Sequence, residues 1–117
     1  MPGDTLKDRL QRTREITLSV TGRTTGRTVS MPVWFVLEGE TLYLLPYQGS
    51  DTQWYRNVLK NPKVKVSTGS VESELTLTPV TGPKEVSSIV EKFRGKHGRD
   101  VKAYYSKFDV ATMATLT

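Results

Sequence analysis

The sequence predicts a mainly β protein, a small barrel of six antiparallel strands with short helices at its ends and between the third and fourth strands. Apolar and polar residues alternate in short segments separated by turn residues, and no strand–helix–strand alternation indicates a parallel sheet. Proline and glycine at positions 32, 39, 49 and 69 supply the curvature that a small barrel needs. At 117 residues, the chain fits one domain over 1–117.

Six segments carry the strand pattern, and short turns join most of them. Strands are expected at residues 16–20, 29–37, 41–45, 63–68, 72–80 and 110–116. Pro32 marks the second strand as an edge or bulged strand. Within residues 1–15, Asp4 can cap a short helix whose Leu6 and Leu10 lie one turn apart, a stripe too thin for a core element. Further helices are expected at 53–60, from residue 84 to the glycines at 95 and 98, and from 100 to 108.

Composition excludes several classes of site. The chain has no cysteine and one histidine, His97, so a disulfide scaffold, a cysteine nucleophile, a Cys/His zinc site and a histidine-clustered metal centre are excluded. We interpret His97 as a solvated cation near a helix end. No apolar run approaches the roughly 20 residues that cross a bilayer, and no secretory signal opens the chain. We therefore expect a soluble, cytoplasmic protein without a stable membrane anchor.

The net charge of +5 is concentrated in the middle of the chain. Residues 41–70 carry Arg56, Lys60, Lys63 and Lys65 against Asp51 alone. This excess suggests an anionic partner, either a phosphate, a carboxylate-rich cofactor or a nucleic acid. A solvated basic face explains the same charges about equally well.

Two loops could bind an anion. The first joins the first two strands and reads Gly22-Arg23-Thr24-Thr25-Gly26-Arg27, where glycines permit close approach and arginines can pair with phosphate or carboxylate. The second reads Pro46-Tyr47-Gln48-Gly49-Ser50 and runs into the helix that carries Trp54-Tyr55-Arg56-Asn57. Because Trp54 and Tyr55 are adjacent, we expect only one of them in the core. Each loop alone is also compatible with an ordinary surface turn.

Together, these segments resemble the deazaflavin-dependent nitroreductase family. The resemblance runs from residue 16 to residue 68 and rests on the Gly22–Arg27 turn, Pro32 in the next strand, the Gly49 loop, Trp54-Tyr55-Arg56-Asn57-Val58-Leu59 and Asn61-Pro62-Lys63-Val64. It implies a six-stranded split β-barrel of the FMN-binding type, often dimeric, with a cofactor groove at its side. Gln48 stands where members of the family usually have a lysine.

The resemblance also implies a cofactor and an activity. The cofactor is the deazaflavin coenzyme F-420, with FMN as the alternative, and the activity is hydride transfer to a quinone, a nitro compound or an activated double bond. The residues expected to bind the cofactor are Arg23, Thr24, Thr25, Gly26 and Arg27 for its tail or phosphate, Pro32, Val33 and Trp34 under the ring, Gln48, Gly49 and Ser50 in the loop, and Trp54 and Asn57 at the ring or polyol.

Three tyrosines could face the substrate, because the chain must supply hydrogen-bond donors where negative charge develops. We predict Tyr104 and Tyr47 as catalytic residues, and we interpret Tyr105 as a packing residue with its phenol at the surface. Two other classes remain open, a cofactor-binding protein without catalysis and a basic barrel that binds single-stranded nucleic acid. We favour the reductase over the nucleic-acid binder because no strand is rich in aromatic residues, so we expect a small-molecule electron acceptor as partner and no nucleic acid.

Overall fold

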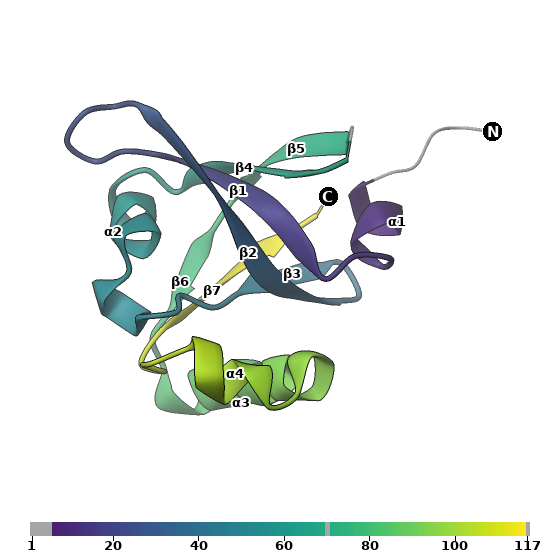
Figure 1. The fold of residues 1–117 in the computed structure, drawn as a ribbon. Coiled ribbons are helices and arrows are strands. Elements are labelled where there is room, and N and C mark those ends of the chain that lie inside the picture. The colour runs from purple at the N-terminus through teal and green to yellow at the C-terminus, as the bar shows by residue number, and fades with distance from the viewer. Residues whose placement is uncertain (1–5, 70, 117) are drawn as a thin grey trace.

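The structure, a computed structural model, describes residues 6–69 and 71–116. The elements run in the order α1 (Leu6–Leu10), β1 (Glu15–Thr21), β2 (Thr28–Glu38), β3 (Thr41–Leu44), the 3-10 turn η1 (Gly49–Asp51), α2 (Gln53–Lys60), β4 (Lys63–Thr68), β5 (Val71–Thr76), β6 (Thr78–Val80), α3 (Pro83–His97), α4 (Asp100–Tyr104) and β7 (Ala111–Thr115). Figure 1 shows a curled sheet with α3 and α4 beneath it and α2 and α1 on opposite sides. Asp4, the expected cap of the first helix, lies outside the described residues.

The seven strands form one antiparallel sheet in the order β5-β4-β1-β2-β3-β7-β6. The prediction of six strands was therefore wrong by one. The expected strand over 72–80 is divided at Leu77, which is buried, and its two parts pair with different neighbours. β5 pairs with β4 at one edge of the sheet, whereas β6 pairs with β7 at the other. Because one residue separates β5 from β6, the two edges lie close together, and the sheet curls into a half-barrel.

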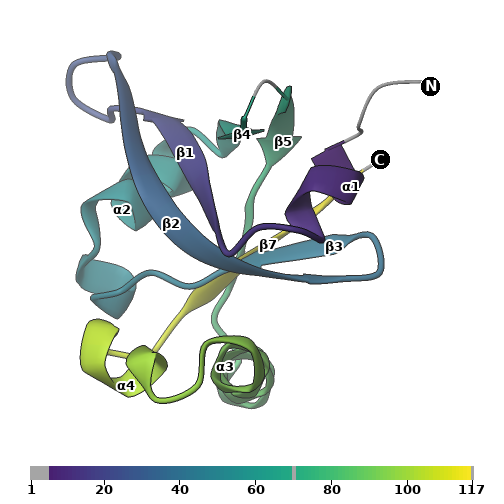
Figure 2. The ribbon, with the colours of Figure 1, turned by 45° about the vertical axis from the view of Figure 1, so that its right-hand side comes forward.

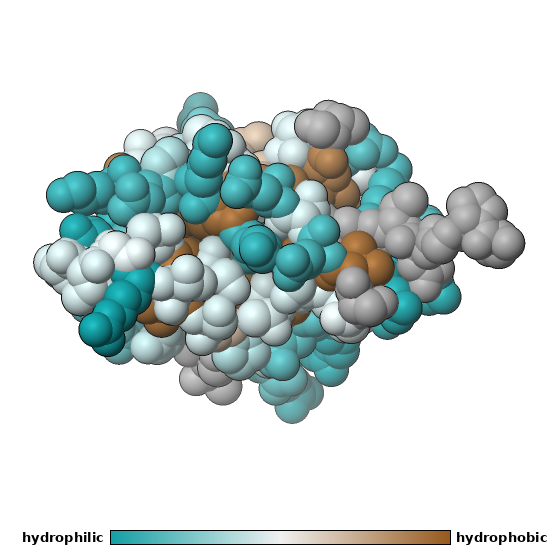
Figure 3. Space-filling view, turned by 90° about the horizontal axis from the view of Figure 1, so that it is seen from above, coloured by the Kyte–Doolittle hydropathy of each residue, from teal (hydrophilic) through white to brown (hydrophobic). Residues whose placement is uncertain are grey.

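The alternation of side chains explains where the core lies. Along β1, Ile16, Leu18 and Val20 are buried, and the intervening residues are not. Val64 and Val66 of β4 continue the same inner face. The face seen from above in Figure 3 is mostly hydrophilic, with hydrophobic residues in separate patches, which agrees with an interior that holds the apolar side chains.

Strand β2 serves two neighbours in succession. Its first seven residues, Thr28–Trp34, pair with β1, and its last four, Phe35–Glu38, pair with β3. Among the described residues, no strand pairs with the other edge of the Thr28–Trp34 segment. Pro32 lies in this segment, which confirms that it marks an edge, and its missing N–H removes one donor from that edge.

The helices cover the sheet on different sides. A second apolar cluster joins α3 and α4 to the outer side of β2 and includes Val36, Phe93 and Tyr105. Figure 2 shows α3 end-on below the strands and α2 beside β1. Both Trp54 and Tyr55 of α2 are buried, so the expectation that only one would be was wrong. Leu10 of α1 is also fully buried, so this short helix does contribute to the core.

Candidate cofactor site

A cavity of about 230 Å³ lies at the unpaired edge of β2. Its walls come from β2, the segment after β3, helix α2 and the segment after α4. The lining residues are Met31, Pro32, Val33, Trp34, Leu45, Tyr47, Trp54 and Tyr105. Five of these eight, namely Pro32, Val33, Trp34, Tyr47 and Trp54, are residues that the sequence predicted for the site. Residues that are up to 74 positions apart in the chain, from Met31 to Tyr105, therefore meet around one cavity.

A larger hollow of about 440 Å³ lies elsewhere, between β5 and the end of β7. Its lining holds no aromatic side chain and none of the predicted site residues. Sites for small ligands are usually lined by apolar and aromatic side chains with a few placed polar groups. The cavity beside β2 fits that description better, so we take it as the candidate site.

Trp34 forms a rigid wall of this cavity because it stacks on His97. The two rings lie 4.6 Å apart with an interplanar angle of 9°, and Tyr105 meets Trp34 edge-on at 6.0 Å. His97 Nε2 donates a hydrogen bond to the backbone oxygen of Phe35 (3.2 Å). These two ring contacts leave Trp34 little freedom to move.

His97 is buried, so its interpretation as a solvated cation was wrong. Burial lowers the pKa of its imidazole, an effect that the hydrogen bond to Phe35 only partly opposes. Its Nδ1 atom is buried and has no hydrogen-bond partner in the described part of the chain. The glycines at 95 and 98 suggested an exposed helix end, but α3 continues through Gly95 to His97 and turns the ring inward.

The tyrosines occupy different positions around the cavity. Tyr47 is 43% exposed, and its backbone oxygen accepts hydrogen bonds from the N–H (2.7 Å) and Oγ (3.2 Å) of Ser106. The side chain of Tyr104 lies outside the described part of the chain. Tyr105 is buried and lines the cavity, so the expectation of a surface phenol was wrong. The spacing of aromatic residues at 104 and 105 could not tell which of them would turn inward.

One arginine of the Gly22–Arg27 turn, Arg23, is held in place by neutral side-chain oxygens of helix α2. The Arg23 backbone N–H and its Nη1 both donate to Asn57 Oδ1, at 3.1 and 2.8 Å, and its Nη2 donates to Gln53 Oε1 at 2.9 Å. Among the described residues no carboxylate pairs with Arg23, so its positive charge is not offset. Asn57 is buried and does not line the cavity.

Most amides of this turn already have partners. Gly22 N–H donates to Arg27 O (2.7 Å), Gly26 N–H to Gly22 O (2.9 Å) and Arg27 N–H to Thr25 Oγ1 (3.2 Å). Within the described part of the chain, only the amides of Thr24 and Thr25 in this turn lack a hydrogen-bond partner, so the expected concavity is reduced to two consecutive amides. Thr24, Thr25, Gly26 and Arg27 are exposed.

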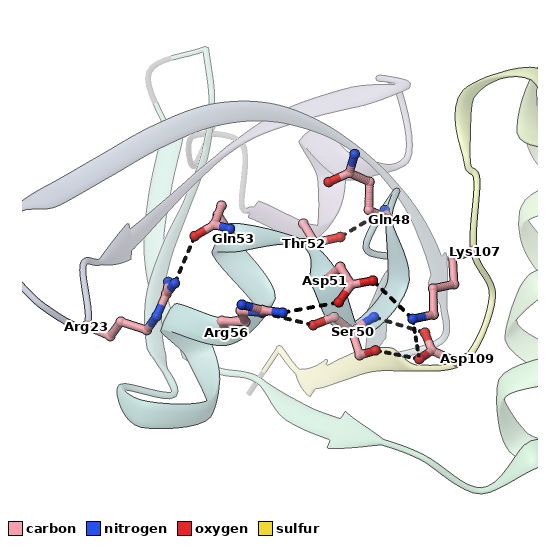
Figure 4. A network of polar contacts seen from close by, with 9 residues as sticks. All are labelled: Arg23, Gln48, Ser50, Asp51, Thr52, Gln53, Arg56, Lys107 and Asp109. Carbon is pink, nitrogen blue, oxygen red and sulfur yellow. Dashed lines mark hydrogen bonds and ion pairs between the residues drawn. The ribbon is translucent and has the colours of Figure 1, made fainter.

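The second loop is filled by a carboxylate from a distant part of the chain (Figure 4). Ser50 donates from its N–H to Asp109 Oδ1 (2.9 Å) and from its Oγ to Asp109 Oδ2 (2.5 Å). Lys107 lies 3.7 Å from Asp109 and 3.1 Å from Asp51, which also pairs with Arg56 at 3.1 Å. The donors that were expected to receive a phosphate thus already bind an internal anion.

The charges of this cluster stabilise one another. The hydrogen bond and charge of Lys107, with a smaller effect of Arg56, lower the pKa of Asp51. Partial burial opposes ionisation of Asp109, but the hydrogen bonds from Ser50 and the charge of Lys107 outweigh it and lower its pKa. Asp51 in turn raises the pKa of Lys107. No sequence pattern linked Asp109 to Ser50, because 59 positions separate them.

The basic excess of residues 41–70 is partly offset in the fold. Arg56 pairs with Asp51, and Lys65 lies 3.7 Å from Glu72 of the neighbouring strand β5. Lys60 and Lys63 are exposed. Helix α2 connects the two parts of the candidate site, because it carries Trp54 in the cavity wall and Gln53 and Asn57 against Arg23.

Comparison with known proteins gives one family and a set of solved structures. A family model described as an uncharacterized protein conserved in bacteria, DUF2255, matches residues 7–117. No curated protein matches the chain. No helix in the described part of the chain is long and apolar enough to cross a membrane.

Three of the solved structures illustrate the range of functions on this fold. An F420-H2-dependent reductase, FDR-A, is 19% identical, with a TM-score of 0.61 over 86% of this chain and 93% of the other. The heme storage protein HutZ from Vibrio cholerae is 14% identical, with a TM-score of 0.71 over 94% and 85%. A pyridoxamine 5'-phosphate oxidase-like protein from Listeria innocua is 15% identical, with a TM-score of 0.66 over 91% and 85%.

These likenesses establish the fold and leave the activity open. The chain has the split-barrel fold that these flavin-reductase-like and oxidase-like proteins share, as the sequence predicted. A further similar structure, 19% identical with a TM-score of 0.62 over 86% of this chain and 79% of the other, is described as a domain-swapped dimer. Some of these proteins are oxidoreductases, whereas HutZ stores heme, so the fold alone does not fix the function.

Proposed function

We propose that this chain, which belongs to the DUF2255 family of bacterial proteins, binds the deazaflavin coenzyme F-420 and acts as a reductase. Its acceptor would be a quinone, a nitro compound or an activated double bond. The observation that carries the proposal is the aromatic cavity beside β2, which five predicted residues line. Helix α2 contributes Trp54 to the wall of this cavity, and the same helix carries Gln53 and Asn57, which hold the side chain of Arg23. No other hollow among the described residues combines these features.

The cavity suits the planar ring of such a coenzyme. Trp34, Trp54 and Tyr105 give it aromatic walls, against which a flat ring can stack or meet an edge. Its volume of about 230 Å³ is below the range of roughly 300 to 1,000 Å³ that is usual for ligand pockets. The ring would therefore fill the cavity, and the rest of the coenzyme would lie outside it.

The tail of the coenzyme would meet the Gly22–Arg27 turn. A deazaflavin carries an oligoglutamate tail, and Arg23 offers a guanidinium whose charge is not neutralised by a described carboxylate. Asn57 and Gln53 hold that guanidinium in place, which reduces the entropy lost when an anion binds. The Gly49–Ser50 loop does not suit a phosphate, because Asp109 already occupies its donors.

When bound, the coenzyme supplies the hydride chemistry, and the chain supplies position and surroundings. The aromatic walls exclude water from the ring. Tyr47 lies at the mouth of the cavity, where its phenol O–H can donate a hydrogen bond to an acceptor oxygen on which negative charge develops. Tyr104 remains a prediction for the same role. The acceptor would enter at the exposed side of the cavity, beside Tyr47.

Two copies of the chain would complete this site. The small volume of the cavity and the unpaired edge of β2 leave room for a second copy, and a similar fold occurs in a domain-swapped dimer. A C2 arrangement is the usual one for such an association. Light scattering at micromolar concentration should give twice the monomer mass of 13.1 kDa. A mass near 13.1 kDa would contradict the dimer and leave the cavity assignment in place.

The alternatives fit the cavity less well. FMN ends at its phosphate and has no oligoglutamate tail that Arg23 could bind. Heme held by a cysteine or a histidine is excluded here, because the chain has no cysteine and its one histidine does not line the cavity. A nucleic-acid surface would need open positive charge, whereas Arg56 and Lys65 pair with carboxylates. A cofactor-binding protein without catalysis would use the same cavity and differ only in turnover.

Titration of F-420 and FMN against the protein tests the proposal. The chain has two tryptophans, Trp34 and Trp54, and both line the cavity, so quenching of their emission reports ring binding directly. We expect tighter binding of F-420 than of FMN, and a Trp34→Phe variant should lose part of the quenching. Turnover of reduced F-420 with a nitro compound or a quinone then separates a reductase from a storage protein. Tighter FMN binding, or no response to either, would overturn the proposal.

A further inference from the structure

We infer that Asp109 acts as a built-in substitute for phosphate at the Gly49–Ser50 loop and makes the protein select against cofactors that place a phosphate there. The part of this inference that concerns cofactor choice rests on the proposed function. The occupation of the loop by an internal carboxylate is independent of that function, since it follows from the contacts within the chain.

The loop is shaped to receive an anion. Gly49 is buried with φ +56°, and a Cβ atom at this position would lie 2.1 Å from Asp109 Oδ1, so the carboxylate rests where a side chain would otherwise stand. Ser50 binds both oxygens of that carboxylate, one through its N–H and one through its hydroxyl. Two donors on two oxygens of one anion is the arrangement by which loops of this kind hold phosphate.

Asp109 takes the one backbone amide of residues 48–52 that is not bonded within the loop. The Gly49 N–H donates to Pro46 O, the Asp51 N–H to Gln48 O and the Thr52 N–H to Gly49 O. Only the Ser50 N–H is left, and Asp109 accepts it. A phosphate would therefore have to displace the carboxylate before it could bind.

The charge balance around the loop also opposes a phosphate. Lys107 and Arg56 are matched by Asp51 and Asp109, so the four side chains sum to zero. A phosphate would add about two negative charges beside two carboxylates. Without Asp109, the same loop would hold two cations against one carboxylate and keep both Ser50 donors free. One side chain thus decides whether the loop repels or attracts an anion.

A second set of contacts keeps Asp109 at the loop. The segment before it is fastened to the loop by Ser106, whose N–H and Oγ donate to Tyr47 O, and by a parallel bridge between Lys107 and Gln48. β7 begins two residues after Asp109 with the buried Ala111. The carboxylate is therefore held on both sides by structure that does not depend on a ligand.

Inorganic phosphate is the probe that tests this inference, because it needs neither F-420 nor turnover. The Ser50 amide resonance is followed while phosphate is added to the wild-type protein and to Asp109→Ala. We expect no saturable shift in the wild type, and in Asp109→Ala a shift that saturates at phosphate concentrations at least about tenfold below the highest one that leaves the wild type unchanged, consistent with recovery of charge-assisted donors. Asp109→Asn keeps the size of the side chain and should show a smaller gain, because its amide still fills the loop without the charge.

Two results would overturn the inference. One is a saturable shift of the Ser50 amide in the wild type, and the other is a folded Asp109→Ala protein that binds phosphate no better than the wild type. If Asp109→Ala does not fold, the Asn variant decides, and absence of any gain there counts against the inference. FMN and riboflavin, which differ by the phosphate alone, give a second comparison: the wild type should bind both equally, and Asp109→Ala should prefer FMN. These phosphate results stand whether or not F-420 binds.

Discussion

The two glycine-containing loops of this protein were both candidates for binding an anion, and they differ in what already occupies them. In the Gly22–Arg27 turn, the partners of Arg23 are the neutral oxygens of Asn57 and Gln53, so the positive charge persists. In the Gly49–Ser50 loop, the partner of the donors is the carboxylate of Asp109, so the attraction for an anion is satisfied within the chain. A glycine loop with donors is a binding site only if its donors are not already used. Four changes test this difference, from the largest expected effect to the smallest.

Replacing Gly49 or Gly26 by alanine should lower the free energy of unfolding by different amounts in the two loops. Gly49→Ala forces a Cβ atom onto Asp109 at a positive φ, and we expect a loss of about 3 kcal/mol in the free energy of unfolding. Gly26 also has a positive φ, +73°, but open space around it, so Gly26→Ala should cost only about 1 kcal/mol. Urea unfolding of both variants measures the difference.

A double variant isolates the role of the carboxylate in that loss. In an Asp109→Ala background the contact with the carboxylate is gone and only the flexible Lys107 side chain, at 3.0 Å, must shift, so Gly49→Ala should cost much less than it does in the wild type. Equal costs of the two alanines in the wild-type background would mean that Asp109 does not pack against Gly49.

Removal of the Arg23 side chain should weaken coenzyme binding. Arg23→Ala removes a charge-assisted contact to the tail, and we expect the binding free energy of F-420 to fall by about 1.5 to 3 kcal/mol. The affinity of the wild type should also fall with added salt, and that of the variant should fall less. Fluorescence titration of both proteins at two salt concentrations checks this. Unchanged dissociation constants for Arg23→Ala and Arg27→Ala would make the turn an ordinary surface.

A single substitution should give the Gly22–Arg27 turn an internal carboxylate partner, as the Gly49–Ser50 loop already has. Asn57→Asp places a carboxylate where Arg23 now meets a neutral amide, without a change in side-chain size. The arginine would then be paired within the chain, and F-420 affinity should fall by about 1 kcal/mol while the fold is retained. Thermal unfolding provides the control for the fold. An affinity equal to that of the wild type would show that neutral partners are not what keeps Arg23 available.

Acid should act on the second loop more than on the first. The folded-state pKa of Asp109 lies below its ordinary value of 3.8, so the folded protein binds fewer protons there than the unfolded chain. The stabilisation is thus present above pH 3.8 and lost as the pH falls below it. Unfolding measured between pH 5 and the acid limit should depend less steeply on pH in Asp109→Asn. A slope identical to that of the wild type would contradict the strength of the Asp109 contacts.

The sequence predicted the elements well because each carries its own local pattern. Alternation located β1, β2 and β4, and the Asn61-Pro62 stop located the end of α2. The division of the 72–80 strand was missed because alternation records which face a residue occupies, and does not record which neighbour the backbone pairs with. Leu77 continues the alternation of the segment, although the backbone pairs with β4 before this residue and with β7 after it.

The residues around the candidate cavity could be picked out in part for a similar reason. Trp34, Trp54 and Tyr47 each lie in a recognisable segment, and the fold brings these segments together around one cavity. Asp109 was missed because its contact with Ser50 spans 59 positions and leaves no local pattern. The inward turn of His97 depends on the continuation of α3 past Gly95, against the usual preference of glycine for helix ends.

The place of β7 in the sheet has a consequence for how the protein is made. Although β7 is the last of the described strands, it lies between β3 and β6, both of which precede it in the chain. During synthesis on the ribosome, the edges of β3 and β6 that pair with β7 therefore remain unpaired until residues 111–115 have emerged. Nascent chains that stall before residue 111 would expose two strand edges at once, and such edges readily pair with those of other chains. Pairing of β7 with β3 and β6 thus also protects the newly synthesised protein from aggregation.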